Sequence, residues 1–269
     1  MPGFSIFKAG AYWMPEAAIE FRDVSFVAGG GRVLLDHISL SIDAGTTTAL
    51  LGRSGSGKTT LLRTVNRMVL PTSGSVYVRG SATLNEEPIA LRRRIGYVIQ
   101  ETGLFPHFTV QRNVGVVPEI SGQPGGDIAA RGRELLSMVG MDADVFSGRY
   151  PHQLSGGQRQ RVGLARALAA DPPILLMDEP FGALDPLTRA EMQHMLRALL
   201  NRLRKTVLLV THDLDEALYL ATRIVLLEEG RVVADLPGNT FASSTIPAVK
   251  AYVRAVHRGS AETPKQVEG

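Results

Sequence analysis

Cysteine is absent from the 269 residues of this sequence. Without it the chain can form neither a disulfide framework nor a thiolate metal site, and nothing in the composition asks for an oxidising compartment. We therefore expect a cytoplasmic setting.

Long apolar runs are missing as well. Runs such as residues 174–177 and 207–210 fall far short of the about 18 apolar residues that a membrane-spanning helix needs. The first stretch carries Lys8, Pro15 and Glu16 and has no unbroken apolar segment after a basic start, so we do not expect a signal peptide. The chain is not expected to cross a membrane by itself.

The sequence also has little excess charge of either sign. Lys and Arg number 29 against 26 Asp and Glu, which gives a net charge of +3. Nucleic-acid-binding proteins usually show a more concentrated positive field, and the one basic run, residues 92–94, fits a solvated helix face. We predict no nucleic-acid partner. The 44% of hydrophobic residues is enough for a sizeable globular core.

The pattern of apolar residues predicts how the chain is organised. Residues 19–42 alternate around a glycine turn, which indicates an antiparallel β element, and a second β region covers residues 75–79 and 95–100. Between them a strand over 46–51 leads to a helix over 58–69 that stops before Pro71.

Residues 105–170 have little strand signal and contain two predicted helices, 128–139 and 158–169, so we interpret them as an inserted helical subdomain. Regular alternation then resumes, which implies a parallel sheet covered by helices. Its predicted strands are 174–177, 206–210 and 224–227, and its predicted helices are 187–204 and 214–221. Beyond about residue 240 we expect one short amphipathic helix and a polar end.

A glycine-rich motif lies between the strand over 46–51 and the helix that follows. Its residues are Gly52, Arg53, Ser54, Gly55, Ser56, Gly57, Lys58 and Thr59, followed by Thr60. They match the P-loop, in which glycines turn backbone N–H groups toward phosphate oxygens at a helix N-terminus. Lys58 would reach the β- and γ-phosphates and Thr59 would bind Mg²⁺. A glycine turn with an incidental lysine is the alternative, which the strand and helix context disfavours.

Two adjacent acids, Asp178 and Glu179, end the apolar run over 174–177. Open α/β sheets bind ligands at the carboxyl ends of their strands. Asp178 would hold Mg²⁺, and Glu179 could polarise the attacking water. Alone, such a pair is more often solvated or capping, but beside a P-loop the catalytic role is favoured.

A second group of small residues precedes the predicted helix 158–169. Leu154, Ser155, Gly156, Gly157 and Gln158 could simply cap this helix, or they could form a second anion-binding terminus. Together with the preceding motifs they match, in order, the signature of the ATP-binding-cassette (ABC) ATPase family, which this chain resembles over roughly residues 19–235.

The resemblance implies a fold and a division of the chain. The expected fold class is α/β, a P-loop NTPase (RecA-like) core with an antiparallel β subdomain and an inserted helical subdomain. The ATPase domain covers residues 17–240, with the core in 17–100 and 171–240 and the helical subdomain in 101–170. Residues 241–269 form a C-terminal helix and tail.

The resemblance also assigns roles to further residues. In this family the signature of one subunit closes over the ATP held by the P-loop of another, which implies a homodimer or a paired ATPase subunit. Gln100 is similar to the glutamine that senses Mg²⁺ and water, His212 to the switch residue that contacts the γ-phosphate, and Asp185 to the aspartate that communicates across the dimer. ATP and Mg²⁺ are the implied cofactors.

One position departs from the family pattern. Members usually carry an aromatic residue that stacks on adenine just before the first glycine loop, where this sequence has Ala28. Phe26 could compensate, although it equally continues the alternation of a strand.

Residues 95–119 and 151–186 further resemble ATPase subunits of osmoprotectant importers, which take up glycine betaine, choline or carnitine. The implied partners are an integral membrane permease and, through it, an external substrate-binding protein, with this chain on the inner face of the cell membrane. Many members continue into regulatory nucleotide-binding repeats; because the sequence runs to Gly269, we do not expect them here.

Three alternatives remain at this point. The chain could serve an importer of polar, amino-acid-like solutes, or it could be an ABC ATPase that acts on nucleic acid or ribosomes. A P-loop metabolic kinase is disfavoured because it has no need of residues 154–158.

Overall fold

The computed structural model describes residues 17–100 and 102–261. Expectations about the first stretch, about Glu101 at the predicted start of the helical subdomain, and about the polar end after residue 261 lie outside these ranges.

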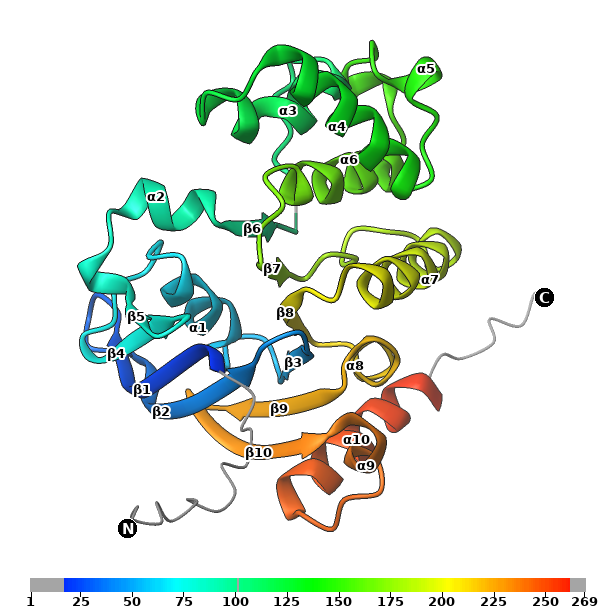
Figure 1. Cartoon of the computed structure of the whole chain (residues 1–269). Helices are drawn as coiled ribbons and strands as arrows, with labels where there is room; N and C mark the ends of the chain where they lie inside the picture. Colours follow the sequence, from blue (N-terminus) through cyan, green and yellow to red (C-terminus); the bar gives the residue numbers. More distant parts are fainter. Residues whose placement is uncertain (1–16, 101, 262–269) are drawn as a thin grey trace, which may run out of the picture.

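Two β-sheets form the middle of the described structure (Figure 1). The antiparallel sheet has the order β2-β1-β4-β5 and the larger sheet the order β10-β9-β3-β8-β7-β6. The antiparallel strands are β1 (Ala17–Val27), β2 (Val33–Asp43), β4 (Ser73–Val78) and β5 (Ser81–Ala82). The larger sheet contains β3 (Thr47–Leu51), β6 (Ile95–Val98), β7 (Ile174–Asp178), β8 (Thr206–Thr211), β9 (Arg223–Glu228) and β10 (Arg231–Pro237). Within it only the β9–β10 pair is antiparallel.

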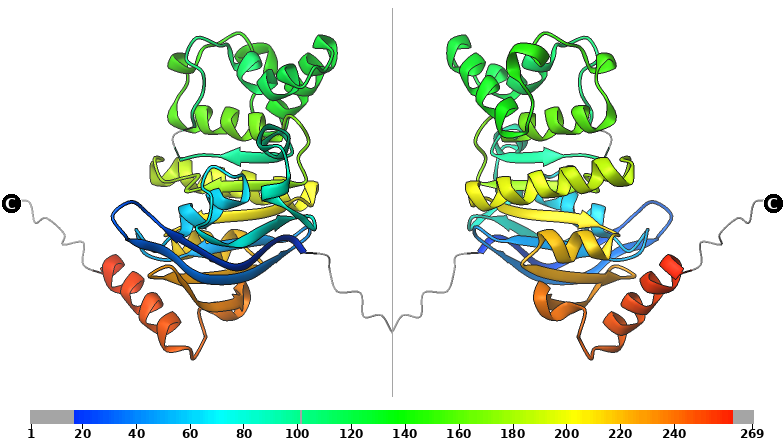
Figure 2. Two further views of the ribbon diagram at one scale, coloured as in Figure 1. Left: turned by 90° about the vertical axis from the view of Figure 1, so that its left-hand side faces the viewer. Right: turned by 90° about the vertical axis from the view of Figure 1, so that its right-hand side faces the viewer.

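Some helices pack along these sheets, and others form a separate group at one end of the molecule. Both views of Figure 2 show α3 to α6 together at one end of the molecule and α9 with α10 at the other. The helices of the described residues are α1 (Lys58–Val65), α2 (Pro88–Arg93), α3 (Val110–Ile120), α4 (Gly125–Met138), α5 (Ala143–Phe146), α6 (Gly156–Leu168), α7 (Pro186–Leu203), α8 (Leu214–Leu220), α9 (Gly238–Phe241) and α10 (Pro247–Ala261). Two 3₁₀ turns add η1 (Thr83–Asn85) and η2 (Pro151–Gln153).

The larger sheet is buried on both faces, which explains its nearly continuous apolar strands. Successive side chains of a strand point to opposite faces. In β7, Leu175 and Met177 join the core beneath α3 to α7, whereas Ile174 and Leu176 face the core shared with the antiparallel sheet and α1. A third cluster packs β3 and β9 against α8, α9 and α10.

This topology brings the ends of several strands to one edge. β3, β6, β7 and β8 are parallel, so the residues that follow them lie along the same carboxyl edge. These residues are the glycine loop after β3, Gln100 after β6, Glu179 after β7 and His212 after β8.

The sheet topology confirms the expected α/β architecture with an antiparallel sheet and a helical insertion. The predicted helix 58–69 was too long, because α1 ends at Val65. There the N–H groups of Met68 and Val69 both donate to the carbonyl of Arg63, and Arg67 takes a left-handed conformation with φ of 55°. The division of the chain into numbered domains stays a prediction.

The helix α3 and the strand β10 are among the elements that the sequence did not predict. The helix α3 contains Pro118, a residue that normally breaks helices. Here it lies in the last turn, so the helix loses little before it ends at Ile120. The edge strand β10 pairs with β9 through a tight turn at Gly230, which takes a φ of 78°. Among the described residues, no helix combines the length and apolar character needed to cross a bilayer.

Phe241 provides a test of the third cluster. Its side chain is fully buried where α9 and α10 dock onto the sheet. We expect Phe241→Ala to lower the free energy of unfolding by about 3–5 kcal/mol, because it leaves a cavity. Leu187→Ala, at a side chain that is 73% exposed, should change it by less than about 0.5 kcal/mol. Urea denaturation measures both, and equal effects would contradict this packing.

Candidate functional site

The glycine loop between β3 and α1 wraps around one ammonium group. Lys58 is almost fully buried, and its Nζ donates to the carbonyls of Gly52 at 2.7 Å and Arg53 at 2.9 Å. The loop must pass close to β2: Gly57 has a φ of +100°, and a Cβ atom there would lie 2.4 Å from the carbonyl oxygen of Leu34. A side chain at residue 57 would therefore force the loop away from β2.

The first turn of α1 differs from those of α6, α7 and α8. Side chains of Ser155, Asp185 and Asp213 cap α6, α7 and α8 by accepting backbone N–H groups. No side chain caps α1, which begins after Gly57. Its free N–H groups and its helix dipole therefore favour an anion.

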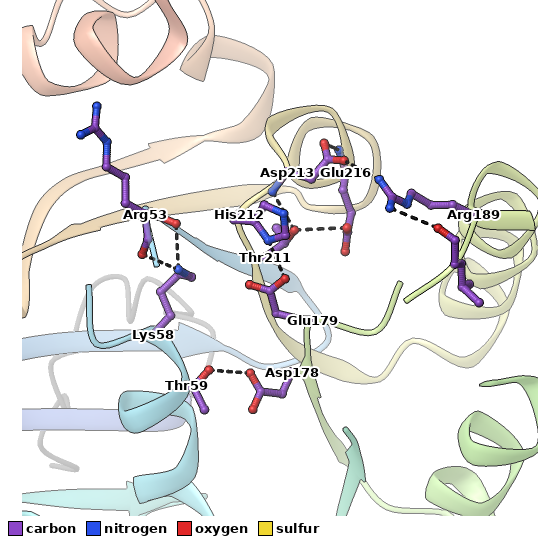
Figure 3. A network of polar contacts seen from close by, with 12 residues as sticks. Arg53, Lys58, Thr59, Asp178, Glu179, Arg189, Thr211, His212, Asp213 and Glu216 are labelled. Carbon is purple, nitrogen blue, oxygen red and sulfur yellow. Dashed lines mark hydrogen bonds and ion pairs between the residues drawn. The ribbon is translucent and has the colours of Figure 1, made fainter. Parts of the chain in front are cut away.

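Asp178 at the end of β7 faces the first turn of α1. Its Oδ1 accepts a hydrogen bond from the hydroxyl of Thr59 at 2.7 Å (Figure 3). On its other side, Oδ2 lies 3.3 Å from Arg63 Nη2 and from the hydroxyl of Tyr97. Thr59 and Asp178 thus place two hard oxygen donors side by side next to the loop that favours an anion.

Glu179 is the next residue and is held by its neighbours. Its N–H donates to the carbonyl of Val210 at 3.0 Å, and its φ of 48° turns the chain away from the strand direction. The Oε2 atom of Glu179 lies 2.5 Å from the Nδ1 atom of His212, which follows β8. The side chains of both residues point into the same space as Lys58 (Figure 3).

The electrostatics of Lys58 reflect this arrangement. Burial lowers the pKa of its ammonium group, while the nearby carboxylates of Glu179 and Asp178 act in the opposite direction. An anion bound at the start of α1 would add a further charge that favours the ammonium form.

These residues line one open cavity of about 850 Å³. It receives Arg53, Ser54, Gly55, Gly57, Lys58, Thr59, Thr60, Gln100, Glu179 and His212 from the predicted site. A Cβ atom at Gly182 would lie 3.3 Å from Gln100 Nε2 and 3.8 Å from Glu179 Oε2, so the glutamine sits beside the catalytic candidates.

The structure does not bring the signature residues into this cavity. Ser155 and Gln158 form a capping box at the start of α6: Gln158 N–H donates to the hydroxyl of Ser155 at 3.2 Å, and Ser155 N–H donates to Gln158 Oε1 at 2.9 Å. Cβ atoms at Gly156 and Gly157 would lie 3.7 Å from Leu184 and 2.5 Å from Thr188. The start of α6 and the loop that carries Asp185 therefore form a second surface, which we call the signature surface (residues 154–158 and 182–188).

Asp185 shows the local role of that surface most clearly. Hydrogen bonds from the side chain and the backbone N–H of Thr188 hold the pKa of Asp185 below its usual value. These hydrogen bonds thus favour the ionised form of the aspartate, which caps α7 just beside Leu184.

Sequence reasoning missed the other wall of the cavity. Arg32 and Leu34 of the β1–β2 region line it, and so do Tyr252, Ala255 and Val256 of α10. The hydroxyl of Tyr252 donates to the carbonyl of His212 at 2.9 Å, and burial raises the pKa of Tyr252 to about 12. The sequence predicted an amphipathic helix in this part of the chain, but its pattern did not indicate which part of the structure the helix would contact.

The position of the missing aromatic residue is also clear. Ala28 does not line the cavity but donates its N–H to the carbonyl of Arg32 at 2.8 Å. Phe26 packs against the core of the antiparallel sheet, so the strand interpretation fits it better than a role in the cavity. Arg32 and Leu34 stand where the hairpin meets the glycine loop.

Comparisons with known proteins agree with this arrangement. Residues 35–182 match the family model described as ABC transporter. The chain is 47% identical over 215 residues to the glycine betaine/carnitine/choline transport ATP-binding protein OpuCA of Bacillus subtilis, covering 80% of this chain and 56% of that protein. It is 46% identical over 230 residues to the glycine betaine uptake system ATP-binding protein YehX of Escherichia coli, covering 86% and 73%.

A solved structure is similar as well. The dimeric post-hydrolysis state of an ATP-binding cassette bound to ADP and Pi matches with a TM-score of 0.73 and 33% identity, covering 81% of this chain and 98% of that one. The chain spans little more than half the length of the Bacillus relative. From its family match, its relatives and its fold, this chain belongs to the ABC transporter family of ATP-binding proteins.

Proposed function

We propose that this chain is the ATP-hydrolysing subunit of an ABC importer. The observation that carries the proposal is one cavity shared by an uncapped helix terminus, the ammonium of Lys58 and the Glu179–His212 pair. A polyphosphate chain satisfies the first two features, and a water molecule beside its last phosphate would meet the third.

The oxygen donors next to the cavity fit Mg²⁺. No group of three or more His, Cys, Asp or Glu side chains gathers in the described residues, so a metal held by protein ligands alone is not indicated. Mg²⁺ is usually bound through only one or two carboxylates and keeps phosphate oxygens and water among its other ligands. Thr59, Asp178 and the amide of Gln100 would hold it, and the ion would neutralise charge on the transferred phosphoryl group.

Glu179 is the proposed general base. Its carboxylate lies at the cavity and is oriented by the bond to His212, so it can accept a proton from a water molecule that attacks the terminal phosphate. His212 uses Nδ1 for this contact, which leaves Nε2 free to donate to the phosphate. Neutral imidazole carries a proton on only one of the two nitrogens, so the imidazolium form, with a proton on both, serves both contacts at once.

The separation of the signature surface from the cavity bears on the pairing of two subunits. Since the signature surface does not line the cavity of its own chain, we propose that it closes over the cavity of a second copy or a paired ATPase subunit. The similar solved ATP-binding cassette is a dimer, which supports this proposal.

The proposed cargo is a small quaternary amine, carried by a separate permease that receives it from an external binding protein. Relatives named for glycine betaine, choline and carnitine transport support this assignment. This chain would lie on the inner face of the membrane. Phe105, 41% exposed in a loop held by Asn113, offers an apolar contact for the permease.

An action on nucleic acid has less support. In the basic run 92–94, Arg92 donates to the carbonyls of Asn66 and Arg67, and Arg94 forms an ion pair with Glu86. Two of the three guanidinium groups are thus engaged within the chain.

Glu179→Gln tests the assigned base. We expect hydrolysis to fall by about 10²–10⁴-fold while ATP binding persists, because the amide cannot accept the proton and the phosphate-binding loop is intact. Gel filtration with ATP and Mg²⁺ should show an accumulated dimer. Adding Ser155→Arg should leave this variant monomeric but able to bind ATP, because the large cation blocks the start of α6. A Glu179→Gln chain that hydrolyses normally would remove Glu179 from its role.

Uptake of labelled glycine betaine, choline and carnitine by cells that express the whole system tests the cargo. We expect at least one to accumulate above a Lys58→Ala background, which lacks the ammonium for phosphate binding. Phe105→Ala should lower uptake more than it lowers ATP hydrolysis by the isolated subunit. Accumulation of an amino acid alone would contradict the quaternary-amine assignment and leave the ATPase assignment standing.

A further inference from the structure

One arginine of α7 reaches between two loops of the core. Arg189 Nη2 donates to the carbonyl of Leu184 at 3.3 Å, and its Nη1 lies 3.7 Å from Asp213 Oδ2 (Figure 3). Leu184 directly precedes Asp185 on the signature surface, and Asp213 directly follows His212. The guanidinium therefore joins the loop at that surface to the loop that carries the switch histidine.

Asp213 is well placed to transmit a shift to His212. Its Oδ1 accepts the N–H of Glu216 at 3.1 Å and so caps α8, which leaves Oδ2 for Arg189. On the other side of His212, the hydroxyl of Thr211 accepts the N–H of Asp213 at 3.0 Å and donates to Glu216 Oε2 at 3.1 Å. His212 thus sits between two residues that the same small network fixes.

The charges of this network favour a contact between Arg189 and Asp213. Burial raises the pKa of Glu216 to about 8, so this neighbour is mostly uncharged at neutral pH and Asp213 carries the negative charge that faces the arginine. Among the described residues, Arg189 Nε and Glu216 Oε1 are buried without a hydrogen-bond partner. The N–H at Arg189 Nε could donate one more hydrogen bond, and Glu216 Oε1 could accept one.

The contact contributes little as a static ion pair. The side chains of Arg189 and Asp213 are 35% and 29% exposed, and partly exposed pairs at such distances add little stability. What distinguishes Arg189 is its planar fork, which can hold a carbonyl and a carboxylate at the same time.

We propose that Arg189 is a positioning residue for ATP hydrolysis. Through its contact with Asp213, Arg189 holds His212 in place beside Glu179. The position of the loop 182–185 controls this contact. The proposal rests on the proposed ATPase function. A second subunit that touches the signature surface would move the carbonyl of Leu184, and the guanidinium would carry this movement to the loop of His212.

Kinetics of Arg189→Ala test the proposal. We expect kcat for ATP to fall about tenfold or more, while ATP binding to the monomer and the thermal unfolding midpoint stay close to wild type. Arg189→Lys should recover part of kcat, because it keeps the charge opposite Asp213 but not the fork. The matched control is Arg197→Ala on the same helix, where the guanidinium stacks 4.5 Å from the ring of Tyr219 and kcat should not change.

A double-mutant cycle separates positioning from other roles. Asp213→Asn keeps an oxygen to cap α8 and removes the charge that faces Arg189. If Arg189 acts through Asp213, the double variant should be no slower than Arg189→Ala alone. Additive losses, an unchanged kcat for Arg189→Ala, or a loss of monomer ATP binding would each overturn the proposal. An inactive wild-type chain would instead refute the ATPase function itself.

Discussion

At the start of α1, backbone N–H groups that side chains satisfy in α6, α7 and α8 remain free, and the buried ammonium of Lys58 lies beside them. This concentration of positive charge favours an anion, and a polyphosphate chain fits it. The remaining parts of the site are arranged around that interaction. The carboxyl edge of the parallel sheet supplies Asp178 toward Thr59 and Glu179 toward His212.

The same topology explains why one chain holds only part of the proposed machinery. The loops after β3, β6, β7 and β8 meet at the cavity, whereas the start of α6 packs against the loop after β7 and turns to another surface. A paired subunit would supply the missing contacts. Arg189 links the two surfaces within one chain, because it reaches from the carbonyl of Leu184 to the carboxylate beside His212.

Local patterns predicted much of this fold. Apolar runs predicted buried strands such as β3 and β7, and the glycine loop predicted the turn into α1. Together these patterns predicted the α/β class. The local patterns did not predict the exact ends of helices and strands or the contacts between residues far apart in the sequence. The helix α3, which contains Pro118, was not predicted. No local sequence pattern could show that Tyr252 would contact His212 or that Arg32 would line the cavity. The roles of the site residues stay predictions, because geometry alone assigns no rate.

Competition binding tests the central claim most directly, since it separates the contribution of the phosphates to ATP binding from that of the adenine base. With Mg²⁺ present, inorganic tripolyphosphate should displace labelled ATP from the wild-type chain, and Lys58→Ala should bind neither ligand measurably. Adenosine should displace little, because no aromatic ring occupies the position of Ala28. Displacement by adenosine but not by tripolyphosphate, or undiminished ATP binding to Lys58→Ala, would contradict the account.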